Sequence, residues 1–255
     1  MFLVIDVGNT NIVFAVCTFN QKKIKILFKY RIHTNLKRTP DEYAYINSYN
    51  FTYNNFSISK LSGVCIASVV PEALTSLKIF IEKFLRKPLL SIDENKLDVK
   101  IEIDNPGDAG QDRLINAFAI KKMNLDPAII IDFGTATTFD IIGKTGSYEG
   151  GIISPGINLS IDSLYNSTSR LPKIILRSLD NEKETLIGKN TISAMESGIF
   201  WGYVCMIEGL INKLKKYYSN SKIIATGGLC EVFKNKISSI DFVEQDLTLY
   251  GLAYY

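Results

Sequence analysis

Two short segments combine an aspartate, a glycine and hydroxyl side chains between apolar runs. Asp6 follows the run Leu3–Ile5 and Asp132 follows Ile129–Ile131, and in each segment a glycine comes two residues after the aspartate. A carboxylate beside hydroxyls and backbone N–H groups suits the phosphates of a nucleotide and their Mg²⁺. One such turn is also typical of a structural hairpin. Two of them, 126 residues apart, predict a duplicated fold with a site between the halves.

Two common nucleotide-binding fingerprints are absent from the sequence. There is no G-x-x-x-x-G-K-[ST] loop and no G-x-G-x-x-G after the first predicted strand. A third glycine turn, Thr226–Gly228, follows a predicted strand. It can contact a phosphate or an adenosine, or it can be a structural turn only.

Asp112 is the candidate general base. It follows the loop Asp104–Gly110 and opens a predicted helix beside Arg113. A carboxylate there can accept a hydroxyl proton while the guanidinium binds an anionic or polar part of a substrate. It can equally be a charge that complements the helix dipole. Spacing alone leaves both interpretations open.

Charge and hydropathy exclude several partner classes. The net charge is +3 and the basic residues are scattered, and Lys213–Lys216 is typical of a solvated helix face, so nucleic acid is not an expected partner. No apolar run approaches the roughly 18 residues that span a bilayer, so we expect no membrane partner. Met1 directly precedes the first predicted strand, so we expect no secretory signal.

Histidine and cysteine offer little chemistry. His33 is the single histidine and lies at a predicted strand end, so we do not expect it to be catalytic. The four cysteines lie far apart without a C-x-x-C pair, which favours reduced thiols of a cytoplasmic protein over a disulfide or a zinc site. They are Cys17, Cys65, Cys205 and Cys230.

The predicted elements repeat in order. The first half has three strands, a helix, a strand and a helix, and the second half repeats its opening strands. Turns are predicted at Asn20–Lys22 and Gly143–Gly146, and an irregular excursion at Ser167–Leu186. The expected strands are Phe2–Val7, Asn11–Thr18, Ile24–Ile32, Gly63–Val69, Ile129–Ile142 in two runs, Tyr148–Ser154, Lys222–Ala225 and one near Phe242. The expected helices follow Thr39, Val70, Gly110, Gly156 and Asn190, with a last one at the C-terminal end.

The paired turns resemble those of the actin, hexokinase and heat-shock ATPase superfamily, and the details resemble the type III pantothenate kinase family. The similar motifs span essentially the whole chain in order. They are DVGNTN from Asp6, NPGDAGQDR ending at Arg113, DFGTATT from Asp132, YEGGIISPG from Tyr148, IGKNTISAMESG from Ile187, ATGG from Ala225 and LTLYGL from Leu247.

This resemblance implies an α/β fold of two ribonuclease-H-like (actin-like ATPase) halves. Each half would be a mixed sheet flanked by helices, with the active site in the cleft between them. We expect residues 1–112 to form the N-terminal half, and residues 113–255 to form the C-terminal half with a dimerisation helix.

The resemblance also implies a reaction: ATP-dependent phosphorylation of pantothenate to 4'-phosphopantothenate, the first step of coenzyme A biosynthesis, in a cytoplasmic homodimer. The family uses Mg²⁺ and a monovalent cation, K⁺ or NH₄⁺. Asp112 would be the catalytic proton acceptor, Asp132 would bind the monovalent cation and Asp6 would bind Mg²⁺ through the phosphates. ATP would contact Asp6, Val7, Gly8, Asn9, Thr10, Asn11, Ile12, Val13 and Thr135. Pantothenate would contact Gly110, Gln111, Asp112, Arg113 and Ile103, with Thr191 reaching in from the neighbouring subunit.

Two positions depart from the family pattern. Gln111 stands where the family usually reads alanine in Gly-Ala-Asp-Arg, and Ile103 falls where a family tyrosine lines the pantothenate pocket. Loss of that ring and hydroxyl is expected to affect substrate affinity rather than the reaction type. The alternatives are another kinase or a phosphohydrolase acting on a sugar, acetate or polyphosphate, and a non-catalytic transcription accessory factor. The intact Asp6, Asp112 and Asp132 favour an enzyme.

Overall fold

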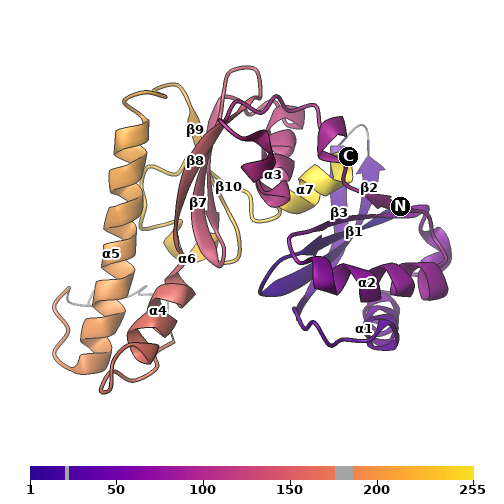
Figure 1. The fold of residues 1–255 in the computed structure, drawn as a ribbon, viewed down its shortest axis with the longest axis horizontal. Coiled ribbons are helices and arrows are strands. Elements are labelled where there is room, and N and C mark those ends of the chain that lie inside the picture. The colour runs from indigo at the N-terminus through magenta and orange to yellow at the C-terminus, as the bar shows by residue number, and fades with distance from the viewer. Residues whose placement is uncertain (21–22, 176–185) are drawn as a thin grey trace. The chain divides into compact units, whose positions relative to one another are not determined.

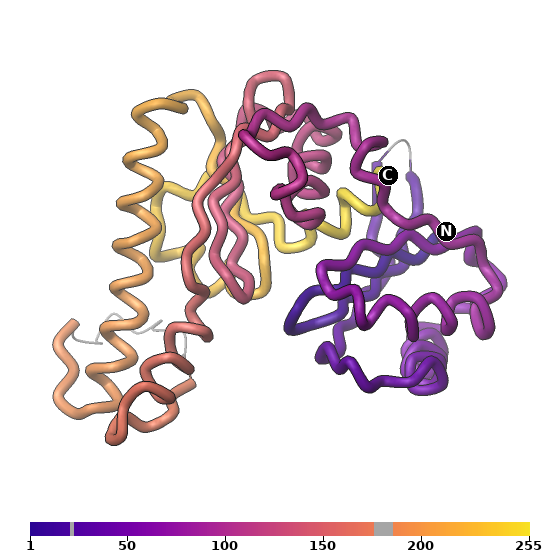
Figure 2. The backbone as a smooth tube through the Cα atoms, viewed as in Figure 1, coloured from indigo at the N-terminus to yellow at the C-terminus, as the bar shows by residue number. Residues whose placement is uncertain are grey.

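The computed structural model describes residues 1–20, 23–175 and 186–255, and the chain divides into two units (Figures 1 and 2). The first unit comprises Met1–Asn124, Gly146–Tyr148 and Asp246–Tyr255, and the second comprises Leu125–Thr145 and Glu149–Gln245. This division differs from the one expected after residue 112. The reason is that helix α3 (Gln111–Lys122) belongs wholly to the first unit, and the C-terminal residues return to that unit.

The first unit is built on a five-stranded sheet with the order β3-β2-β1-β4-β5. β1, β2 and β3 form an antiparallel meander, and β4 and β5 run parallel to β1. Alternate residues of β1 are apolar and buried under helices α1 and α2, since successive side chains of a strand point to opposite faces (Figure 1). The strands are β1 (Phe2–Val7), β2 (Asn11–Asn20), β3 (Lys23–His33), β4 (Gly63–Ser68) and β5 (Leu89–Ser91).

The helices of the first unit begin where the sequence signals predict. Thr39 caps α1 (Pro40–Tyr53) through a capping box with Glu42, and Pro71 opens α2 (Pro71–Phe80), which continues as a π-helical turn, Ile81–Leu85. Short 3₁₀ turns cover Ile58–Lys60, Glu94–Lys96 and Pro106–Asp108. Near the C-terminal end, α7 (Leu247–Tyr254) packs against α3, β1 and β4.

The second unit repeats the same strand order, β10-β9-β6-β7-β8. β6 and β7 are antiparallel, and β9 and β10 run parallel to β6, as β4 and β5 do to β1. The expected duplication of a mixed sheet flanked by helices is therefore confirmed. The strands are β6 (Ala128–Phe133), β7 (Ala136–Ile142), β8 (Tyr148–Pro155), β9 (Lys222–Thr226) and β10 (Phe242–Val243). The helices are α4 (Ile157–Asn166), α5 (Thr191–Leu214) and α6 (Cys230–Phe233).

The predicted strand and helix positions agree with these bounds to within about three residues. Two predictions fall partly outside the described residues: the turn at 20–22 includes residues 21–22, and the excursion at 167–186 includes residues 176–185. The short strand β5 and the short helix α6 were not predicted. Within the described part of the chain, no helix combines the length and the hydropathy needed to cross a membrane.

Candidate functional site

Asp6 lies near the end of β1, directly before the turn that connects β1 to β2 in the first unit. The Gly8 N–H donates to the Asn11 carbonyl at 3.0 Å, which closes the turn. The Thr34 hydroxyl donates to the Gly8 carbonyl at 2.7 Å, and the Thr34 N–H donates to the Thr10 carbonyl at 2.9 Å. The segment that follows β3 therefore braces the candidate phosphate turn.

The predicted ATP contacts on this turn differ in exposure. Asn9 and Thr10 are exposed at its tip, whereas the Val7 and Ile12 side chains are fully buried in the core. Val7 and Ile12 can therefore offer only their backbone groups to a ligand.

Asp112 and Asp6 lie close enough to interact electrostatically. Burial, with a further contribution from the Asp112 charge, raises the pKa of Asp6 to about 7. Asp112 occupies the first turn of α3, and its Oδ1 accepts a hydrogen bond from the Arg113 N–H at 2.9 Å. A Cβ at Gly110 would lie 2.7 Å from that Oδ1. The structure thus brings together two of the three aspartates that the sequence singles out.

The other predicted pantothenate contacts in the first unit have defined surroundings. The Arg113 guanidinium lies 5.4 Å from the centre of the Tyr148 ring, and Tyr148 is 1% exposed, so the cation rests on a fixed aromatic face. The Gln111 side chain contacts Ser68 and Glu94. Ile103 is half-buried, beside the bridge that pairs Ile101 with Tyr148.

The second unit holds an equivalent turn at Asp132. The Gly134 N–H donates to the Ala136 carbonyl at 3.1 Å, and Thr135 is exposed. The Gly156 N–H donates to the Thr135 carbonyl at 3.1 Å, and a Cβ at Gly156 would lie 2.2 Å from that oxygen. Only glycine, which has no Cβ, allows the backbone at position 156 to approach the turn this closely.

The three threonines of this segment differ in exposure, and Thr135 is the exposed one. The Thr137 side chain is fully buried, and the Thr138 hydroxyl donates to Asp140 at 2.9 Å.

The Thr226–Gly228 turn contacts Asp132 directly. Gly227 has a φ of +90°, and a Cβ there would lie 2.4 Å from Asp132 Oδ1. Burial, with a further contribution from the Asp132 charge, raises the pKa of Tyr203. Burial also raises the pKa of Cys230 to about 11, with smaller contributions from the Glu231 and Asp132 charges. A carboxylate beside a glycine-lined backbone provides the oxygen ligands that alkali cations take, which fits the predicted monovalent-cation site.

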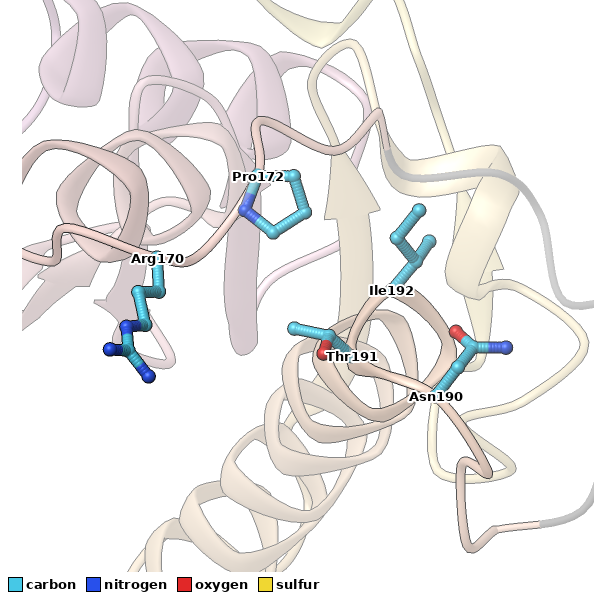
Figure 3. Close-up of a pocket in the computed structure, with 5 residues that line it drawn as sticks. All are labelled: Arg170, Pro172, Asn190, Thr191 and Ile192. Atoms are coloured by element: carbon cyan, nitrogen blue, oxygen red, sulfur yellow. The ribbon is translucent and has the colours of Figure 1, made fainter.

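Thr191 is the first residue of α5 in the second unit, and Asn190 caps that helix. Thr191 lines a pocket of about 410 Å³, together with Ile192 and the preceding Asn190. Figure 3 shows these residues. Arg170 and Pro172, from the segment after α4, complete the lining. The side chain that the resemblance assigns to pantothenate is therefore at a hollow of the surface.

Asp6 suits a magnesium ion that is bound mainly by phosphates. In the described residues, no three His, Cys, Asp or Glu side chains cluster in metal-binding range. Magnesium does not need such a cage, because it usually takes one or two carboxylates plus phosphate oxygens and keeps several waters. The crowding of Asp6 and Asp112 is the kind of charge pair that a cation relieves.

The raised pKa of Asp6 predicts a pH-dependent stability that Asp6→Asn removes. Between about pH 4 and pH 7 the folded chain keeps a proton on Asp6 that the unfolded chain has released, so the free energy of unfolding falls as pH rises. Denaturant unfolding of magnesium-free protein at several pH values measures this slope. We expect the free energy of unfolding to decline less steeply with pH in the variant than in the wild type. Equal slopes in the two proteins would contradict the raised pKa of Asp6.

Four features of the site were not predicted from the sequence. They are the hydrogen bond from Thr34 to the Gly8 carbonyl, the contact of Arg113 with the Tyr148 ring, the hydrogen bonds of the Gln111 side chain and the close approach of Gly156 to Thr135. Each is a contact between segments far apart in the chain. Tyr148 and Gly156 carried a signal because both fall within the YEGGIISPG motif, and Gln111 carried one because it falls within NPGDAGQDR, whereas Thr34 lies in none of the motifs.

Comparisons with known proteins identify the family of this chain. The sequence profile of the family described as type III pantothenate kinase matches residues 2–213. The chain is 39% identical over 255 residues to a type III pantothenate kinase of Listeria welshimeri, covering 99% of this chain and 95% of that protein.

Solved structures bear on the fold alone. A Campylobacter jejuni protein described as a conserved Baf-family transcriptional activator has a TM-score of 0.58 at 19% identity, over 99% of this chain and 96% of that one. A glucokinase from an Antarctic psychrotroph has a TM-score of 0.50 at 12% identity, over 99% and 97% of the two chains. The expected actin- and hexokinase-like fold class is confirmed. By its sequence, the chain belongs to the type III pantothenate kinase family.

Proposed function

We propose that this chain transfers the γ-phosphoryl group of ATP to pantothenate, giving 4'-phosphopantothenate and ADP in the first step of coenzyme A biosynthesis. The similarity to type III pantothenate kinases over 99% of the chain carries this conclusion. The proximity of Asp6 and Asp112 supports it, because phosphoryl transfer requires a phosphate-binding turn beside a proton acceptor.

The ATP phosphates are proposed to bind the segment Asp6–Val13 and the exposed Thr135. The exposed residues Asn9 and Thr10 would contact the nucleotide, while Val7 and Ile12 would contribute backbone only. Asp6 would hold Mg²⁺, which supplies charge neutralisation on the phosphates when bound.

Pantothenate is proposed to bind the segment Gly110–Arg113, with Ile103 beside it. The primary hydroxyl oxygen of pantothenate bonds to the γ-phosphorus as the bond to the ADP oxygen breaks, and the hydroxyl proton passes to the Asp112 carboxylate. The transition state is loose, so the proton leaves late and a carboxylate is a sufficient acceptor. Arg113, held against Tyr148, is placed to bind the anionic or polar end of the substrate.

Three further assignments complete the proposal. Asp132 would bind K⁺ or NH₄⁺, and the enzyme would act as a cytoplasmic homodimer. Thr191, beside the pocket in Figure 3, would contact the pantothenate bound by the other subunit.

ADP release tests the reaction and the cation together. Purified protein is mixed with ATP, Mg²⁺ and pantothenate, with and without K⁺. Release that requires both pantothenate and K⁺ is the expected result. Release without pantothenate dependence would assign another substrate, and no release in K⁺ or NH₄⁺ from folded protein would favour a non-catalytic role.

Thr34→Val tests the bracing of the phosphate turn. The substitution keeps the side-chain shape but removes the hydroxyl that donates to the Gly8 carbonyl. We expect a stability loss of about 1 kcal/mol and a several-fold higher KM for ATP, with an unchanged KM for pantothenate. Steady-state kinetics in each substrate measure this, and an ATP KM equal to that of the wild type would show that the turn does not need Thr34.

A further inference from the structure

The side chain of Gln111 joins three segments of the first unit. Its Oε1 accepts a hydrogen bond from the Ser68 N–H at 3.2 Å, and its Nε2 lies 3.4 Å from Glu94 Oε1, to which it donates. Gln111 is the first residue of α3, Ser68 is the last residue of β4, and Glu94 opens the 3₁₀ turn after β5. The amide therefore ties the start of α3 to two elements on the β5 side of the sheet.

The Ser68 N–H is a donor that the sheet does not pair. The Val69 N–H donates to the Val7 carbonyl of β1, so the Ser68 N–H points away from β1, toward the β5 side. β5 ends at Ser91, opposite Ile66. The Gln111 carbonyl oxygen takes the place that a longer β5 would fill, and it satisfies a half-buried donor that would otherwise cost stability.

This contact bears on the placement of Asp112. Val7 pairs with Ser68, and Asp6 pairs with Ala67, in the parallel register of β1 and β4. Gln111 directly precedes Asp112, and its partner Ser68 directly follows Ala67, the strand partner of Asp6. A helix start that is tied at this point keeps the Asp112 carboxylate near Asp6.

We propose that Gln111 is a positioning residue, whose amide sets the distance of Asp112 from the phosphate turn. This rests on the proposed kinase function, and Gln111 acts through Asp112, with its side chain directed to Ser68 and Glu94. An alanine at position 111 could not make these contacts.

Gln111→Met is the informative variant. Methionine has a similar length but no strong acceptor, so it keeps the packing and loses the bond to Ser68. We expect kcat to fall roughly 10-fold, because a small displacement of a reacting group is costly, while the KM for ATP stays within about 2-fold of the wild type. Amide hydrogen exchange gives a readout independent of activity: the Ser68 N–H should exchange faster in the variant.

The rescue uses Gln111→Glu combined with Glu94→Gln. A carboxylate oxygen at 111 again accepts from the Ser68 N–H, and an amide at 94 donates to it, so the two groups are exchanged. We expect this pair to recover most of kcat and the protection of the Ser68 N–H, whereas Glu94→Gln alone should leave both close to wild type.

Three results would overturn the positioning role: a wild-type kcat for Gln111→Met, an unchanged exchange rate at Ser68, or a double variant no better than Gln111→Met. A wild-type protein that releases no ADP with pantothenate would instead refute the proposed function. The exchange measurement separates the two cases, because it reports the contact without any substrate.

Discussion

Asp112→Asn is expected to lower kcat by roughly 10²- to 10⁴-fold while leaving the chain folded. The amide cannot accept the proton of the pantothenate hydroxyl. Its carbonyl oxygen can still accept the hydrogen bond from the Arg113 N–H, so the start of α3 keeps its local contact. Steady-state kinetics and a thermal unfolding curve measure the two quantities on the same preparation.

Asp41→Asn is the matched control for the helix-dipole interpretation. Asp41 is an exposed carboxylate in the first turn of α1, 4.0 Å from the Lys83 ammonium, so its removal costs the favourable interaction with that helix dipole and a weak surface ion pair. We expect a small loss of stability and wild-type turnover. Near-normal turnover of Asp112→Asn would reduce Asp112 to the same helix-terminal role.

Gly227→Ala is expected to destabilise the second unit on the order of 3 kcal/mol, because two costs add. A φ of +90° is unfavourable for alanine, and the new Cβ would meet Asp132 Oδ1 at 2.4 Å and the Phe133 nitrogen at 2.7 Å. Relief of the clash would also displace the proposed cation ligand, so we expect the dependence of turnover on K⁺ to weaken.

Trp201 makes this stability measurement local. It is the single tryptophan of the chain and lies in α5, so its fluorescence during denaturant unfolding reports on the second unit. The control is Gly209→Ala in the same helix, where, outside the adjoining backbone of α5, a Cβ meets no atom of the described residues within 4 Å. We expect that variant to gain about 0.5–1 kcal/mol. Equal stabilities of the two variants would contradict the close approach at Gly227.

Local signals predicted most of the fold. The bounds of β1 match the prediction, and Thr39 and Pro40 start α1 as expected, because capping and apolar periodicity act over a few residues. β5 was missed because three residues carry too little periodicity. The membership of α3 and α7 in the first unit was also missed, since packing between segments more than a hundred residues apart leaves no local pattern.

For the candidate site, the sequence singles out residues but does not predict their contacts. Asp6, Asp112 and Asp132 were recognisable from their turns, but the proximity of Asp6 to Asp112 follows from the pairing of β1 with β4 and from the start of α3. Glycines 156 and 227 were visible as turn residues. The oxygen atoms that forbid a side chain there belong to other segments, and no spacing rule identifies them.

The return of α7 to the first unit has a consequence for synthesis on the ribosome. Gly251 lies against Ile115 so closely that a Cβ would be 2.5 Å from its carbonyl oxygen, and Thr248 donates to Asn116 at 2.8 Å. Residues 1–124 therefore emerge with one side of α3 and of the sheet uncovered, and they stay so until residues 246–255 are translated. The second unit, by contrast, has all its residues by position 245. The first unit holds the proposed catalytic base. Its strands are translated first, yet it is the second of the two units to be completed.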